Sequence, residues 1–84
     1  MNKQAEAAKH IQELLSKRGF NIPRKKLTLP ENQEWVIFER EGKQIGIDTA
    51  SGVWVRIKDR DWRYIGLPCT VSCAIQAGDF LTKA

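Results

Sequence analysis

Residues 34–58 read EWVIFEREGKQIGIDTASGVWVRIK, and this stretch decides the fold. Its side chains alternate with a period of two over residues 34–40, 43–49 and 53–58, and its apolar residues are Val, Ile, Trp and Phe. That pattern is typical of β-strands. The segments between the three runs are short and contain glycine, as tight turns do. We therefore expect three strands that pair antiparallel as a meander.

The chain on either side of this meander sets the limits of the sheet. Downstream, Asp59-Arg60-Asp61 indicates another turn and residues 62–65 a short fourth strand, so the sheet is expected within residues 34–65. Upstream, residues 19–33 contain Pro23 and Pro30, which exclude a long helix and a central strand. We predict an ordered connector over 19–33.

The two ends of the chain have the periodicity of helices. Residues 2–18 are rich in helix formers and place apolar side chains at three- and four-residue spacing, and Gly19 is a typical helix end. A second helix is predicted over residues 69–83. Its expected core face consists of Val71, Ala74, Ile75, Gly78 and Leu81. The sequence thus predicts an α+β fold: an N-terminal helix, a three- to four-stranded antiparallel meander, and a C-terminal helix packed on one sheet face.

Length and composition indicate one small intracellular domain. The 84 residues suffice for a single domain over residues 1–84 and are too few for two. No apolar run approaches the roughly 18 residues of a membrane span, and the start of the chain lacks the apolar segment of a signal peptide. Two cysteines are a poor disulfide framework for a secreted domain. We expect a cytoplasmic protein with no membrane partner.

Residues suited to catalysis or metal binding are scarce in this sequence. His10 is the single histidine, no pair of acids is set up for acid/base chemistry, and the glycines do not form a phosphate-binding loop. Cys69 and Cys73 share a helical face, but a structural zinc site needs four ligands, so we expect buried thiols. The sequence predicts no enzyme, no cofactor, no metal site and no small-molecule substrate.

The net charge of +4 comes from the N-terminal part of the chain. Residues 1–33 carry seven basic and three acidic side chains. The excess concentrates in Lys17, Arg18, Arg24, Lys25 and Lys26. Such a cluster suits contact with phosphates or with an acidic protein surface. Its simpler interpretation is a solvated helix end followed by a linker, because basic residues also oppose the helix dipole.

The strand over residues 53–58 carries the main candidate binding surface. Alternation places its Val and Ile residues toward the core and places Trp54, Arg56 and Lys58 on the opposite face, with Arg63 from the next segment beside them. One interpretation is an open surface on which a partner stacks. The other is that the first helix or the connector covers Trp54. We expect Trp35 and Trp62 to seal the edge of the core.

These features predict a small non-enzymatic binding module. The leading hypothesis is protein–protein interaction and self-association as a homodimer, through the open sheet face and the apolar C-terminal helix. The alternative is a nucleic-acid-binding domain that uses the basic stretch 17–26 for phosphates and Trp54, Arg56 and Arg63 for stacking. No family signature is recognised in the sequence.

Overall fold

The computed structural model describes residues 3–66 and 71–83 and confirms the α+β class. The elements are α1 (Lys3–Lys17), β1 (Lys25–Thr28), β2 (Glu34–Arg40), β3 (Lys43–Ile47), β4 (Val53–Ile57), β5 (Arg63–Gly66) and α2 (Val71–Thr82). Within the described ranges, neither helix has the length and apolar character needed to cross a membrane.

All five strands form one antiparallel sheet in sequence order, so each strand pairs with the next. The predicted fourth strand is present as β5. The additional strand is β1, which lies within the segment predicted as a connector. It has four residues, two of them lysines, and no alternation of apolar side chains. It is an edge strand, and prolines next to it are tolerated because one side of an edge strand needs no hydrogen bonds.

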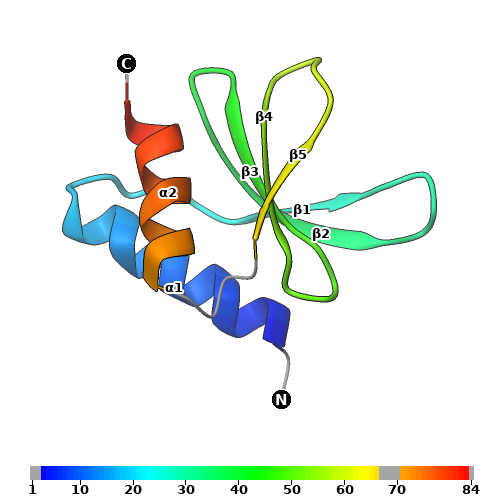
Figure 1. The fold of residues 1–84 in the computed structure, drawn as a ribbon, viewed down its shortest axis with the longest axis horizontal. Helices are drawn as coiled ribbons and strands as arrows, with labels where there is room; N and C mark the ends of the chain where they lie inside the picture. The colour runs from blue at the N-terminus through cyan, green and yellow to red at the C-terminus, as the bar shows by residue number, and fades with distance from the viewer. Residues whose placement is uncertain (1–2, 67–70, 84) are drawn as a thin grey trace.

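Both helices lie on one side of the sheet, and the β1–β2 hairpin projects away from them (Figure 1). The α2 helix packs on β2, β3, β4 and β5, while α1 packs mainly on α2 and also reaches β3. The sheet face toward the helices carries the alternating apolar residues of the central strands. The largest fully buried side chains are Phe38, Ile11, Leu15, Ile45, Ile47, Leu81 and Val53. This core confirms the prediction that the C-terminal helix packs on one sheet face.

The end of α1 follows the predicted glycine signal. Gly19 has a φ of 85°, which is a left-handed conformation that glycine adopts without a steric penalty. The backbone N–H of Phe20 donates to the Leu15 carbonyl at 2.9 Å, and that of Gly19 donates to the Ser16 carbonyl at 3.0 Å. These two bonds form a Schellman motif. Phe20 then packs against the core.

The buried face of α2 matches the predicted one at Ala74, Gly78 and Leu81 and differs from it at Val71 and Ile75. Val71 and Ile75 are exposed, by 77% and 39%. The buried residues are Cys73, Ala74, Ala77, Gly78 and Leu81. The reason is that α1 approaches α2 at Gly78, where an added Cβ would lie 2.9 Å from Leu14 Cδ2. The smallest residues therefore turn inward. Cys73 is buried as expected, and Cys69 lies outside the described residues.

Candidate functional site

The sheet face away from the helices is crossed by one row of residues in register. Lys25 pairs with Ile37, Ile37 with Gly46, Gly46 with Trp54, and Trp54 with Tyr64. Directly opposite residues of paired strands share a face. The row thus runs from the β1 edge to the β5 edge, and Trp54 lies near its end.

Four aromatic side chains gather around this row, and we call them the aromatic face: Trp35, Trp54, Trp62 and Tyr64. The ring centroids of Trp35 and Trp54 are 5.7 Å apart, and those of Trp35 and Trp62 are 5.2 Å apart. Trp54 and Tyr64 meet edge to face at 5.0 Å. Trp35 is only 6% exposed, whereas Trp54 and Trp62 are half-buried and Tyr64 is 49% exposed. Trp35 is thus the base of a cluster whose other members reach the surface.

Gly46 makes this cluster possible because it leaves room over the middle of the sheet. A Cβ at this position would lie 2.7 Å from Trp35 Cε3 and 3.0 Å from Trp62 Cη2. Real Cβ atoms do not approach ring carbons that closely, since packed interiors have no spare space. The absent side chain at Gly46 therefore admits two indoles, one from β2 and one from the β4–β5 loop.

The orientation of Trp54 is fixed by the turn between β3 and β4. Its Nε1–H donates to Asp48 Oδ2 at 2.7 Å. Asp48 Oδ1 accepts the backbone N–H groups of Ala50 at 2.9 Å and of Gly52 at 2.7 Å. Asp side chains commonly stabilise turns in this way. One carboxylate thus holds both the turn and the indole.

Arg56 packs over one member of the aromatic face. Its Cζ is 4.3 Å from the centroid of the Trp62 ring, which is a cation–π geometry. Its Nε–H donates to Gln44 Oε1, and Gln44 Nε2 donates in turn to Glu39 Oε2. Because Gln44 is buried, this chain of hydrogen bonds holds the guanidinium in one place.

The structure brings together two of the four predicted sheet residues. Trp54 and Arg56 lie on the same face, as alternation requires. Lys58 is exposed beyond the end of β4. Arg63 pairs with Val55, whose side chain is in the core, so Arg63 lies on the helix side of the sheet. Its neighbour Tyr64 occupies the place predicted for Arg63 beside Trp54.

Neither interpretation of Trp54 holds in full. The side chain is half-buried, and the groups that pack against it are Trp35 and Tyr64 rather than α1 or the connector. Trp35 is buried, as expected for an aromatic residue at the edge of a core, but it packs with half-buried Trp62 on the aromatic face and not in the cluster beneath the helices. Successive side chains of a strand point to opposite faces, so Trp35 lies on the face opposite to the core residues Val36 and Phe38 of the same strand. All three side chains are apolar, so the sequence did not show which of them point toward the helices.

The predicted basic stretch is dispersed over several sides of the molecule. Arg18 forms an ion pair with Asp79 of α2, and Lys26 Nζ lies 3.0 Å from Glu34 Oε1 of the neighbouring strand. Lys25 belongs to the row that crosses the aromatic side of the sheet. Lys17 and Arg24 line an open hollow of about 530 Å³ beside α1.

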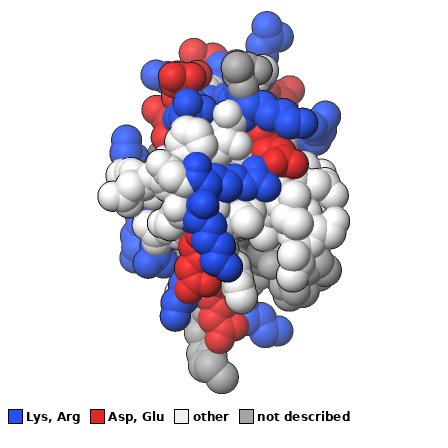
Figure 2. Space-filling model, turned by 90° about the vertical axis from the view of Figure 1, so that its left-hand side faces the viewer, with Lys and Arg blue, Asp and Glu red and all other residues white. Residues whose placement is uncertain are grey.

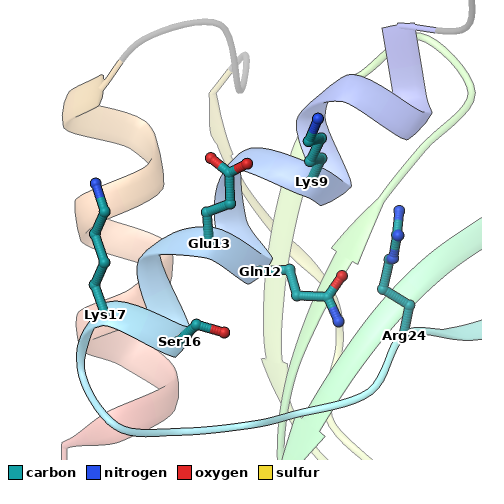
Figure 3. Close-up of a pocket in the computed structure, with 6 residues that line it drawn as sticks. All are labelled: Lys9, Gln12, Glu13, Ser16, Lys17 and Arg24. Atoms are coloured by element: carbon teal, nitrogen blue, oxygen red, sulfur yellow. The ribbon is translucent and has the colours of Figure 1, made fainter.

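The hollow beside α1 is of mixed charge. Figure 3 shows Lys9, Glu13 and Lys17 projecting from α1 toward the same side, with Arg24 beyond Gln12. Figure 2 shows the same pattern on a larger scale, since basic side chains on the helix side of the molecule alternate with acidic ones. Phosphate binding favours a concentrated positive potential. The basic stretch does not form such a surface here.

The described residues contain no group of three or more His, Cys, Asp and Glu side chains that could hold a metal ion. His10 is exposed on α1. Sequence reasoning missed four members of the site: Tyr64, Gln44, Asp48 and Glu39. Asp48 could have been found from its place before a glycine-containing turn. Tyr64 could have been found only from the register of β4 against β5, which the sequence does not reveal.

Comparison with protein-family models, curated proteins and solved structures gave no significant match.

Proposed function

We propose that this chain is a non-enzymatic module that binds a protein partner through the aromatic face. The observation that carries the proposal is the grouping of Trp54, Trp62 and Tyr64 beside the stacked guanidinium of Arg56. Trp, Tyr and Arg are the residues that dominate binding energy at protein–protein interfaces. All four side chains keep some exposed surface for a partner to cover.

The aromatic face is organised before any partner binds. Asp48 holds the Trp54 indole, and Gln44 holds the Arg56 guanidinium. Ordering a flexible side chain at an interface costs about 0.5–1.5 kcal/mol. Side chains that are already fixed avoid this cost, so the hydrogen bonds support recognition as well as stability.

Nucleic-acid binding is the weaker alternative for this face. Stacking a base requires an open ring face, yet Arg56 covers the Trp62 ring and Trp35 is buried. Glu39 and Asp48 lie on the same side of the sheet and oppose a phosphate backbone. The dispersal of the basic stretch further weakens the alternative, since Arg18 and Lys26 are already paired with acids.

Self-association is supported less strongly than binding of a different protein. The apolar circumference of α2 made a second copy of the chain attractive as a cover, but the sheet and α1 cover one side of α2 within one chain and leave only Val71 and Ile75 as large exposed apolar residues on it. Sedimentation over a range of concentrations tests the point. A dimer that is lost in Tyr64→Ala would make a second copy of this chain the partner of the aromatic face.

Site-specific photo-crosslinking tests the proposed function. A benzophenone amino acid replaces the exposed Tyr64 in one variant and the exposed Ser16 of α1 in a control variant. We expect a protein that crosslinks from position 64 and not from position 16. With purified components, Tyr64→Ala should weaken its binding at least about tenfold, or about 1.4 kcal/mol. Equal crosslinking from both positions, or crosslinking to nucleic acid, would overturn the proposal.

A further inference from the structure

A second hollow lies on the helix side of the sheet, at the end where β4 and β5 meet. Its volume is about 270 Å³. Its apolar wall consists of Ile57 and Phe80, with Val55 beneath them. Ile57 is 57% exposed, although it is a large aliphatic side chain. Val55 is buried, so this wall continues the core outward to the surface.

Three arginines and one acid make up the rest of the lining, and we call this site the arginine hollow. The charged residues are Arg56, Arg60, Arg63 and Asp61. Among the residues that the structure describes, Arg60 and Arg63 form no ion pair, and both are exposed. Arg56 directs its guanidinium to the Trp62 ring, so Arg60 and Arg63 supply the positive charge beside the apolar wall, in excess over the single Asp61.

We propose that the arginine hollow binds an acidic segment of the protein partner. Carboxylates of the segment pair with Arg60 and Arg63, and an apolar side chain of the segment packs on Ile57 and Phe80. Guanidinium groups match carboxylates because two parallel N–H groups donate to two oxygens. The inference rests on the proposed function and adds to it the chemistry of the partner.

The size of the hollow favours a side chain over a small-molecule ligand. Sites for small molecules typically measure about 300–1,000 Å³ and enclose most of the ligand. The arginine hollow lies near the lower end of that range and is open on the surface, so it cannot enclose a ligand. Such a site suits one apolar side chain flanked by charged neighbours, which is what a peptide segment offers.

The position of the hollow links it to the aromatic face. Arg56 lines the hollow and carries its guanidinium over the Trp62 ring. Arg63 and Tyr64 are adjacent on β5 and lie on opposite faces of the sheet. A partner that covers Tyr64 therefore reaches the hollow by passing around the β5 edge, where no further strand of residues 3–66 and 71–83 pairs with the sheet.

Selection from a phage-displayed library of short random peptides tests the inference. The whole chain is the immobilised target. We expect recovered peptides to be enriched in Asp and Glu next to a large apolar residue. A synthetic peptide of that kind should bind Arg63→Glu at least about tenfold more weakly than wild type, and its affinity should fall as salt is raised.

Three comparisons keep this test decisive. Lys9→Glu, a charge reversal on exposed α1, should change peptide affinity less than about twofold, which is under about 0.5 kcal/mol. Arg60→Glu is the second variant, because Arg60 lies in a loop and its replacement leaves β5 intact. The same peptide with phosphoserine or with glutamine in place of its acids distinguishes carboxylate recognition from phosphate recognition and from apolar contact alone.

Several results would overturn the inference. They are peptides without enrichment of acids, equal binding to wild type and Arg63→Glu, an equal loss in Lys9→Glu, or a preference for phosphoserine over carboxylate. If these occur while the crosslinked partner still depends on Tyr64, the arginine hollow fails and the proposed function stands. If acidic peptides depend on Arg63 while no protein crosslinks from position 64, the proposed function fails and the hollow remains a peptide site.

Discussion

The two faces of the sheet are both rich in apolar side chains, but they are stabilised in different ways. The face toward the helices carries aliphatic residues and Phe38, and two helices bury it. The opposite face carries three indoles and a phenol that pack on one another, on Gly46 and under Arg56. No helix covers that face in the described chain. The helices bury the first face and thereby stabilise the fold. The side chains of the aromatic face pack mainly on one another, and they form a surface on which polar groups are held in place.

The largest loss of stability is expected for a substitution in the core between the sheet and the helices. Phe38 is fully buried between the sheet and the helices. Phe38→Ala should lower the free energy of unfolding by about 3–5 kcal/mol, because it removes transfer energy and leaves a cavity. Denaturant titration followed by circular dichroism measures the change. A loss below about 1 kcal/mol would contradict the assignment of this face as the core.

A smaller loss is expected for Trp54→Ala on the aromatic face. The side chain is half-buried, so the loss should be about 2–3 kcal/mol, below the range for a fully buried tryptophan. Trp54→Phe keeps a ring but removes the hydrogen bond to Asp48 and part of the packed ring surface, which together should cost about 1–2 kcal/mol. Losses equal to that of Phe38→Ala would make this face a second core, and losses near zero would make it an open surface.

Gly46→Ala tests the close packing of the aromatic face. The new Cβ would press on Trp35 and Trp62, so we expect a loss of about 1–2 kcal/mol and a changed near-ultraviolet circular dichroism spectrum. Gly42→Asn is the control. Gly42 has a positive φ, which asparagine tolerates, and no atom within 4 Å of an added Cβ, so the aromatic spectrum should stay unchanged. An unaltered spectrum in Gly46→Ala would refute the packing described here.

The smallest effect on stability is expected for Tyr64→Ala. Tyr64 is 49% exposed at the rim of the aromatic face, and its replacement should cost less than about 1 kcal/mol. The same variant should show a large loss of partner binding. The ratio of the two effects separates a recognition residue from a packing residue. A stability loss above about 2 kcal/mol would show that Tyr64 is a packing residue.

Much of the fold could be predicted from the sequence, because period-two alternation and turn glycines are local signals. The strand β1 could not, since its four residues gain their partner only through pairing with β2. The buried face of α2 was predicted in part, since Ala74, Gly78 and Leu81 are buried but Val71 and Ile75 are not. Hydrophobicity favoured Val71 and Ile75, but the close approach of α1 selected the small residues around Gly78.

The candidate site was predicted less completely than the fold. Alternation within one strand correctly placed Trp54 and Arg56 on the same face. The choice between Arg63 and Tyr64 depended on the register of β4 against β5, which shifts near Val53 and Trp54. A sequence shows which residues of one strand share a face, but it does not show which residues of two strands lie opposite each other. Arg63 was therefore assigned to the wrong face.

Titration of tryptophan fluorescence tests the central claim most directly, because all three tryptophans of the chain lie on the aromatic face. The protein is titrated at low salt with the crosslinked partner and, separately, with single-stranded and duplex oligonucleotides. We expect a saturable change with the protein partner and none with nucleic acid. Saturable quenching by oligonucleotides that weakens steeply with salt, together with no response to the protein, would contradict it.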